Sequence, residues 1–281
     1  MQRREFIRAR RNQLSNLRHF FGLKRDPFPQ NLPVKELYPL PSLDPLKKRV
    51  LFAIEQRAIT VITGDVGSGK STSLRYISSQ CHSSEYHLIP LIGGVFSLME
   101  LYRQILLSFG IEYHSFQVAI MVHKIRELIL EIASRKVTPV LIIDEAHLLK
   151  QTIFAQLHTL MQFEFDSRPV MPMILCGQDL LLDYLMSTTA RPLASRVLGR
   201  SHLEAIRKEV MAEYLSHHLH LAGCTKNIFT DDAIFAIHQG SGGLLRKANS
   251  LAKAAMLAAG MEESQNVSAE HVRLASTEIF I

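Results

Sequence analysis

The chain has 281 residues, of which 47% are hydrophobic, and it carries a formal net charge of +6. This length and apolar content are enough for one large domain, or a medium domain with a smaller companion, and they exclude a compositionally disordered chain. No apolar run reaches the roughly 18 residues that cross a bilayer, and no apolar stretch follows the arginine-rich start as it does in a secretory signal. Three separated cysteines without a C-x-x-C pair suggest neither disulfides nor a zinc site. We expect a soluble, cytoplasmic protein without an integral membrane segment.

The positive charge is concentrated in a basic arm, residues 1–25. The arm contains eight lysines and arginines against Glu5 alone, a net charge of +7, so the remaining 256 residues sum to −1. A near-neutral body with such an arm favours a polyanionic partner, above all nucleic acid. The predicted contacts are Arg3, Arg4, Arg8, Arg10 and Arg11. The alternatives are a solubilising tail, a segment that binds anionic lipid, and an organelle transit peptide, because the arm is also acid-poor and loosely amphipathic.

Six prolines follow the arm and predict an extended linker over residues 26–45, because proline fixes φ and keeps the preceding residue out of the helical region. From residue 46 to 207, strands and helices alternate. The predicted strands are Ile59–Thr63, His87–Leu91, Val140–Ile143, Met173–Cys176 and a short last one near His202–Ala205. Near-continuous apolar strands between helices predict an α/β domain with a parallel sheet that helices cover on both faces.

The first predicted strand leads into the phosphate-cradling pattern G-x-x-x-x-G-K-[ST]. Its residues are Gly64, Asp65, Val66, Gly67, Ser68, Gly69, Lys70 and Ser71. The glycines let successive backbone N–H groups turn inward around a polyphosphate, Lys70 can reach the outer phosphates, and the Ser71 hydroxyl can bind Mg²⁺. A glycine turn before an ordinary helix is the structural alternative. The pattern predicts a nucleotide site.

The strand Val140–Ile143 ends in two carboxylates, Asp144 and Glu145. Asp144, at the carboxyl end of a buried strand beside the phosphate loop, can hold Mg²⁺ through water or orient Ser71. Glu145 can polarise a water that attacks the γ-phosphate, which is the role of a general base. The alternative is an acidic cap on the helix that follows. The stretch from Asp144 to His147 is common beside a hydrolysed nucleotide and favours ATP hydrolysis.

Further polar residues lie between the fourth and fifth predicted strands. Gln178 is a candidate water-positioning group, and the polarity of an ordinary turn is its alternative. Arg191, Arg196 and Arg200 form a cationic segment just before the last strand. An arginine at this place often reaches a neighbouring subunit's nucleotide and stabilises the transferring phosphoryl group. We expect this role for Arg196 first and Arg200 second, with a solvent-exposed arginine as the alternative for each.

Residues 208–281 predict helices only, and therefore a second, smaller, all-helical lid domain. The predicted helices are Val210–Leu221, Asp231–His238, Leu244–Ala259 and Ala269–Ser276. A glycine turn precedes the third of them, and its first turn carries Arg246, where the helix dipole disfavours a cation. We expect Arg246 to reach the γ-phosphate and to couple nucleotide state to domain angle. The histidines of the first helix lack H-E-x-x-H spacing, so we interpret them as surface or packing residues.

Together these motifs resemble those of an AAA+ ATPase. The segments that are similar to the ExeA-like branch are Phe20-Phe21-Gly22-Leu23 with Pro27-Phe28, the phosphate loop, Asp144 to His147, Gly177-Gln178, and Ser195-Arg196-Val197 with Arg200. That branch is related to the TnsC, TniB and MuB regulators of transposition. The resemblance covers residues 19–260. It implies a P-loop sheet domain with a helical lid, ATP at their junction near Leu37 and Tyr38, and homo-oligomers, either rings or helical filaments, with Arg196 at the shared interfaces.

Two departures favour the mobile-element relatives. ExeA-type secretion proteins continue into a membrane segment and a peptidoglycan-binding region, neither of which is found in this sequence, and the basic arm precedes Phe20. The mobile-element relatives assemble on DNA with ATP and deliver a transposase to its target. The expected function is therefore an oligomeric, ATP-dependent regulator of transposition on double-stranded DNA. The alternatives are a secretion-type assembly ATPase with a membrane partner and, last, a small-molecule kinase, which shares only the phosphate loop.

Overall fold

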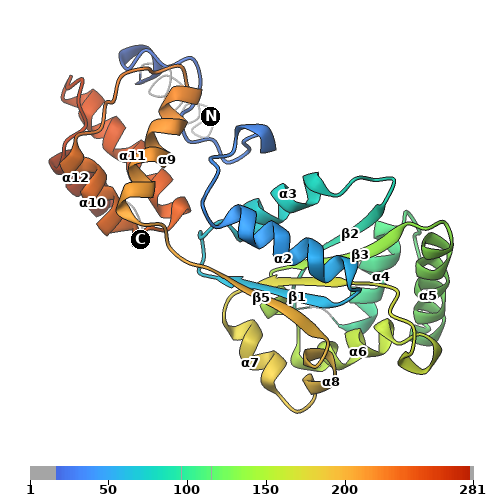
Figure 1. Cartoon of the computed structure of the whole chain (residues 1–281). Coiled ribbons are helices and arrows are strands. Elements are labelled where there is room, and N and C mark those ends of the chain that lie inside the picture. The colour runs from blue at the N-terminus through green and yellow to red at the C-terminus, as the bar shows by residue number, and fades with distance from the viewer. Residues whose placement is uncertain (1–16, 96, 115, 279–281) are drawn as a thin grey trace, which may run out of the picture. The chain divides into compact units, whose positions relative to one another are not determined.

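The computed structural model describes residues 17–95, 97–114 and 116–278, which form two compact units (Figure 1). The sheet unit consists of residues 41–65 and 69–204. The helical unit consists of the described residues up to Leu40, the loop tip Val66–Ser68, and the described residues from Ala205 onward. Residues 26–40, expected to be part of an extended linker, belong to the helical unit. Phe28 explains this difference, because its ring is 1% exposed and lies in the core of that unit.

The sheet unit is built on five parallel strands in the order β2-β3-β4-β1-β5. The strands are β1 (Ile59–Gly64), β2 (Tyr86–Ile92), β3 (Thr138–Asp144), β4 (Met173–Gly177) and β5 (Val197–Leu203). β1 pairs with β4 and β5, and β3 pairs with β2 and β4, all in parallel. The predicted α/β fold class is confirmed. The carboxyl ends of β1, β4 and β3 lie side by side, which is where parallel sheets place their ligand sites.

Helices cover both faces of this sheet, as the buried apolar strands require. The helices are α2 (Leu43–Glu55), α3 (Lys70–Gln80), α4 (Leu98–Ser108), α5 (Val118–Ser134), α6 (Gln151–Met161), α7 (Leu180–Met186) and α8 (Arg191–Ala194), with the short 3₁₀ turns η2 (Ala146–Leu148) and η3 (Glu164–Asp166). Neighbouring residues of a strand face opposite cores. Val61 packs into the core with α4 to α8, and Ile62 packs into the core with α2 and α3.

The last strand differs from its prediction. β5 begins at Val197 and ends at Leu203, whereas the sequence predicted a strand near His202–Ala205. β5 is an edge strand, and its first four residues are only half-buried or exposed, so the apolar pattern that marks the inner strands is weak there. Arg200 therefore lies within the strand, opposite Val61 of β1, and not before it.

The helical unit contains η1 (Val34–Glu36), α9 (Lys208–Leu221), α10 (Asp231–Ser241), α11 (Leu245–Met261) and α12 (Ala269–Glu278). The Thr230 hydroxyl caps α10 by accepting the Ala233 N–H at 3.2 Å. Phe21, Leu23 and Phe28 add apolar side chains from the N-terminal segment to the core of these helices. The segment from residue 20 to 28 thus supplies part of this unit's core.

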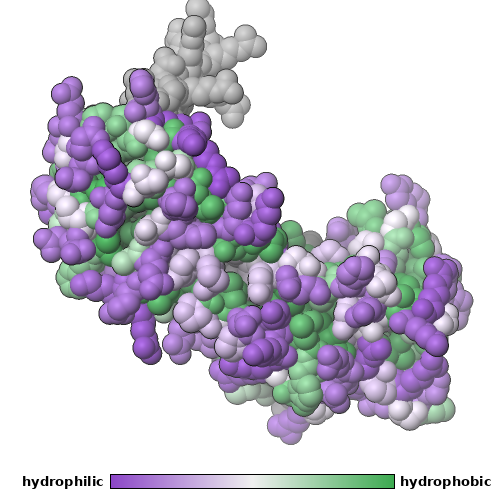
Figure 2. Space-filling model, turned by 45° about the horizontal axis from the view of Figure 1, so that its top comes forward, coloured by the Kyte–Doolittle hydropathy of each residue, from purple (hydrophilic) through white to green (hydrophobic). Residues whose placement is uncertain are grey.

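On the face drawn in Figure 2, hydrophilic side chains cover most of the surface and apolar side chains emerge in patches between them. Within the described ranges, no helix combines the length and the apolar character that crossing a membrane requires. Large apolar side chains that are exposed include Phe116 and Phe165.

Candidate functional site

The phosphate loop connects β1 directly to α3. Gly67 has φ +87° and Gly69 has φ +101°, a left-handed backbone region that glycine adopts without the strain a side chain brings. Gly69 is also the residue that precedes the first turn of α3. The free N–H groups and the partial positive charge at the start of an eleven-residue helix suit an anionic ligand.

Two side chains of the loop have a geometry that suits a phosphate ligand. Lys70 is 5% exposed as a residue, and its ammonium donates to the carbonyls of Gly64 and Asp65, each at 2.9 Å. The Ser68 hydroxyl is buried and has no hydrogen-bond partner among the described residues. A buried hydroxyl without a partner costs about 1–3 kcal/mol. The loop is therefore built for an acceptor that arrives from outside the chain, as a phosphate oxygen does.

The two predicted carboxylates lie at the end of β3, beside β4. Asp144 is the last residue of β3, and its Oδ1 accepts the N–H of Glu145 at 2.9 Å. The Cys176 thiol lies near Asp144 at the end of β4, and burial raises its pKa far above the usual range, with the charge of Asp144 adding to the shift. The Ser71 hydroxyl and the Asp144 carboxylate are ligand types that Mg²⁺ prefers, so the residues at this edge of the sheet fit a magnesium nucleotide.

The backbone of Glu145 is held in an unusual conformation. Its φ of 53° and ψ of 35° lie in the left-handed region. The Gly93 N–H, just after β2, donates to the Asp144 carbonyl at 2.6 Å, and the Leu148 N–H donates to the Glu145 carbonyl at 2.9 Å. A Cβ at residue 93 would lie only 2.4 Å from the Glu145 carbonyl oxygen, so the close approach requires glycine. Strained residues that neighbours fix in this way are typical of functional sites.

The structure brings Gln178 close to Glu145 through a third residue, His147. The Gln178 N–H, at the end of β4, donates to His147 Nδ1 at 3.3 Å. The same Nδ1 lies 3.5 Å from Glu145 Oε2. The sequence predicted roles for Glu145 and Gln178 but assigned none to His147. The sequence offered one signal for a role of His147, which is its position two residues after Glu145. A second signal was Gly177 just before Gln178, since a glycine permits a close approach.

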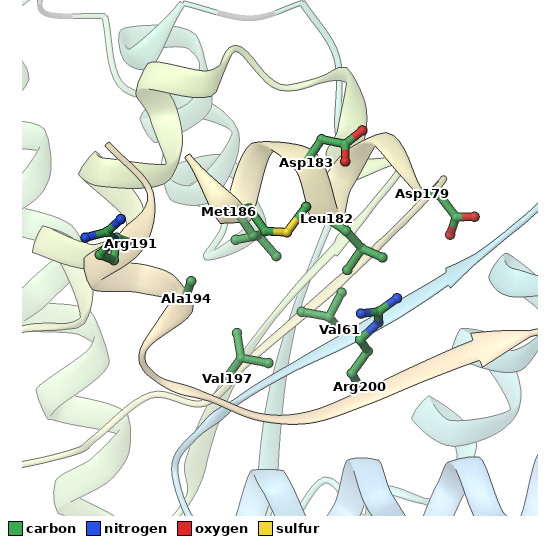
Figure 3. Close-up of a pocket in the computed structure, with 10 residues that line it drawn as sticks. Val61, Asp179, Leu182, Asp183, Met186, Arg191, Ala194, Val197 and Arg200 are labelled. Atoms are coloured by element: carbon green, nitrogen blue, oxygen red, sulfur yellow. The ribbon is translucent and has the colours of Figure 1, made fainter. Parts of the chain in front are cut away.

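The three arginines around β5 have different surroundings. The Arg196 guanidinium pairs with the carboxylate of Asp166 in η3, and burial lowers its pKa. Arg191 and Arg200 are exposed and line a cavity of about 640 Å³ between α7, α8, β5 and β1. Figure 3 shows Arg200 and Asp179 at one end of this cavity and Arg191 at the other, with apolar side chains such as Val61 between them. Action on a neighbouring subunit stays a prediction for each arginine.

The remaining predicted site residues lie in the helical unit or outside the described residues. Arg246 is exposed in the first turn of α11. Leu37 and Tyr38 follow η1 and are half-buried. The Tyr38 hydroxyl donates to Glu213, and burial together with that carboxylate raises its pKa to about 12. Their roles toward the nucleotide stay predictions. Arg3, Arg4, Arg8, Arg10 and Arg11 lie outside the described residues.

A parallel sheet with a phosphate loop after β1 and a carboxylate pair after β3 defines a P-loop ATPase. Residues 54–185 match the family described as "AAA domain". These residues are thus similar to an AAA domain, and together with the phosphate loop and the carboxylates they indicate a P-loop ATPase.

Individual proteins extend the similarity over most of the chain. The General secretion pathway protein A of Aeromonas hydrophila is 27% identical over 262 residues, which cover 92% of this chain and 48% of that protein. The chain thus spans about half the length of this relative. Its similarity supports the expected ExeA-like resemblance.

Two solved structures share the fold at low sequence identity. The Cdc6p structure from Pyrobaculum aerophilum has a TM-score of 0.66 and 16% identity, covering 94% of this chain and 71% of its own. A structure of Drosophila ORC bound to DNA has a TM-score of 0.64 and 15% identity, covering 92% of this chain and 65% of its own. At these identities the likeness concerns the fold alone.

Proposed function

We propose that this protein uses an ATP cycle to assemble an oligomer on double-stranded DNA and to release it, and that it acts in transposition by bringing a transposase to its target. The observation that carries the ATP part is the phosphate loop, with its buried Lys70 ammonium and its unpartnered Ser68 hydroxyl. The groups for hydrolysis stand at the ends of the neighbouring strands β3 and β4.

Each group has a distinct task in this proposal. The N–H groups of the phosphate loop, Lys70 and the Ser68 hydroxyl bind the phosphates. Bound Mg²⁺, for which Ser71 and Asp144 supply oxygens, would neutralise the charge that develops on the phosphates. Glu145 accepts a proton from the attacking water, and Gln178 orients that water. Arg246 and an arginine of a neighbouring subunit, first Arg196, complete the site.

The DNA part of the proposal rests on charge. The basic arm holds a net +7 while the rest of the chain is near neutral, and five of its arginines lie between residues 3 and 11. The structure of Drosophila ORC bound to DNA has the same fold. The likeness of fold makes DNA association a reasonable extension, and the cytoplasmic location expected from the sequence is compatible with it.

Salt and nucleotide dependence test this proposal together. If five arm arginines contact phosphates, the logarithm of the affinity for duplex DNA should fall with the logarithm of salt with a slope of about −4 to −5. The variant in which these five arginines are changed to glutamine should lose most of that slope. ATP should favour the DNA-bound oligomer over ADP, since only differential binding can drive a cycle. Binding that ignores both salt and nucleotide contradicts the proposal.

The role in transposition needs its own experiment. Purified protein, ATP, target DNA, a candidate transposase and donor DNA that carries its transposon ends would be combined, and the positions of insertions would be sequenced. We expect insertions to cluster where the protein is bound, and we expect Lys70→Ala to remove this clustering. Insertions that are equally frequent with and without the protein would contradict this role.

A second function is favoured by one specific observation, the similarity to General secretion pathway protein A over 92% of this chain. In that case the ATPase would assemble a secretion apparatus with a membrane partner, and the basic arm would bind anionic lipid. Flotation with vesicles of mixed neutral and anionic lipid separates the two functions. Binding to these vesicles with no affinity for duplex DNA would favour the secretion function.

A further inference from the structure

His147 occupies a position that no role in hydrolysis has yet explained. It lies in η2, two residues after Glu145, and its side chain is 6% exposed. One ring nitrogen, Nδ1, faces both strands of the candidate hydrolytic site. It lies 3.3 Å from the Gln178 backbone nitrogen on β4 and 3.5 Å from Glu145 Oε2 on the β3 side.

The two contacts of Nδ1 require opposite proton positions. A neutral imidazole with its proton on Nε2 accepts the Gln178 N–H through Nδ1. A proton on Nδ1 would allow donation to Glu145, but it would leave the Gln178 N–H without its acceptor. The donor N–H of Gln178 is fixed by the backbone, so we assign the acceptor role to Nδ1. The ring then contacts Glu145 by packing and bonds to β4.

Gly177 makes this contact possible. A Cβ at residue 177 would lie 3.0 Å from His147 Nδ1 and 3.1 Å from the His147 backbone nitrogen. Both distances are shorter than ordinary van der Waals contact. The end of β4 therefore approaches His147 as closely as it does because residue 177 has no side chain.

We propose that His147 is a positioning residue for ATP hydrolysis. Its Nδ1 accepts the Gln178 N–H and so fixes the backbone of Gln178 relative to Glu145. The Gln178 side chain, which orients the attacking water, then stays aligned with the Glu145 carboxylate, which accepts the proton of that water. This role rests on the proposed hydrolytic roles of Glu145 and Gln178. A misplacement of about 1 Å at a reacting centre can cost about a hundredfold in rate, so a buried hydrogen bond that fixes register is worth a large part of the rate.

Two substitutions separate positioning from simple packing. His147→Ala removes the acceptor, and we expect the kcat for ATP hydrolysis to fall about 10- to 100-fold while the Kd for ATP changes less than about threefold. His147→Asn places an amide oxygen close to the position of Nδ1, where it can accept the Gln178 N–H. We expect this variant to recover most of the lost kcat. Single-turnover hydrolysis and titration with a fluorescent ATP analogue measure the two quantities in the full chain.

His271→Ala is the matched control. His271 is similarly buried, and its Nδ1 also accepts a backbone N–H, that of Ser268 at 2.9 Å, but it lies in α12 of the helical unit. Its loss should lower thermal stability as much as His147→Ala does and leave kcat unchanged. If both substitutions lower kcat alike, the effect is one of general stability and the proposal is wrong.

A double substitution tests whether His147 affects kcat through Gln178. In a Gln178→Ala background, His147→Ala should cost less than about threefold further, because the group that it positions is already missing. Full additivity, a wild-type kcat for His147→Ala, or failure of His147→Asn to recover activity would overturn the proposal. If Glu145→Gln and Gln178→Ala themselves hydrolyse ATP normally, the proposed hydrolytic function fails first, and the pattern of variants distinguishes the two failures.

Discussion

Gly93 offers the sharpest test of how the candidate base is held. The substitution Gly93→Ala adds one methyl group beside the backbone of β3. That carbon would lie 2.4 Å from the carbonyl oxygen and 2.8 Å from the carbonyl carbon of Glu145. Ordinary contacts of a Cβ begin at about 3.4 Å, so one of the two backbones has to move by about 1 Å. No flexible side chain is available to absorb the change.

The expected loss of stability follows from two contributions. Forced overpacking of this kind costs about 1–3 kcal/mol. The movement also breaks the 2.6 Å hydrogen bond from the Gly93 N–H to the Asp144 carbonyl, which adds about 1 kcal/mol. We therefore expect the free energy of unfolding of the sheet unit to fall by about 2–4 kcal/mol. Because Glu145 is displaced as well, kcat for ATP hydrolysis should fall more than about tenfold while the phosphate loop still binds ATP.

Urea denaturation followed by circular dichroism measures the stability, and single-turnover hydrolysis measures kcat. Gly260→Ala is the control, since Gly260 lies in α11 and the new Cβ would meet only side-chain atoms, Leu17 Cδ1 at 3.1 Å and Phe20 Cδ1 at 4.0 Å. Alanine is the better helix former by about 1 kcal/mol, so this variant should be neutral or slightly more stable. Normal stability and normal kcat in Gly93→Ala would refute the idea that Gly93 fixes Glu145.

Four further predictions concern single side chains. Lys70→Ala should abolish measurable binding of a fluorescent ATP analogue, because the ammonium faces the phosphate cradle. Glu145→Gln should bind ATP with unchanged Kd, lower kcat at least a hundredfold, and accumulate ATP-bound oligomers in size-exclusion chromatography; normal hydrolysis would exclude Glu145 as the base. Arg196→Ala should hydrolyse slowly but recover when mixed with Lys70→Ala subunits, and absence of recovery would argue against action between subunits. Burial lowers the pKa of His218 from 6.5 to about 4, so the unfolded chain binds the proton more tightly. The contribution of His218 to stability should be constant above about pH 6.5 and be lost, by up to about 3 kcal/mol, as the pH drops toward 4, and His218→Asn should remove this part of the pH dependence in urea titrations at each pH.

The inner strands were predictable because burial on both faces leaves an unbroken apolar run in the sequence. Both ends of β1, β3 and β4 lie within two residues of their predicted bounds. β5 was misplaced for the same physical reason, because an edge strand needs no such run and carries Gly199 and Arg200 in its middle. The N-terminal segment was expected to be a linker on the strength of its prolines. Local backbone preference could not reveal that Phe28 is buried among helices almost 200 residues away.

The candidate site could be predicted from the sequence where its residues are contiguous, and its chemical roles stay predictions. Each of two motifs is a continuous stretch of sequence, namely Gly64 to Ser71 and the pair Asp144 and Glu145. The strand order places both at the carboxyl ends of the parallel strands. His147 could not be assigned from the sequence, because its contact with the Gln178 backbone joins residues 31 positions apart. The pairing of Arg196 with Asp166 likewise depends on the turn η3, whose residues have positive φ. The periodicity of apolar residues in the sequence does not indicate such a turn.

Glycines on two neighbouring strands determine where Glu145 stands. Gly93 follows β2 and Gly177 ends β4, and each lets its backbone approach the segment from Glu145 to His147 more closely than a Cβ would permit. The left-handed conformation of Glu145 is unfavourable by itself, and it is held by the bond from the Gly93 N–H to the Asp144 carbonyl and by the bond from the Leu148 N–H to the Glu145 carbonyl. The backbone position of Glu145, the proposed base, therefore depends on how closely β2 and β4 approach the end of β3. If Glu145 and Gln178 have the proposed roles, a shift of Gln178 at the end of β4 would reach Glu145 through His147, whose Nδ1 contacts both residues.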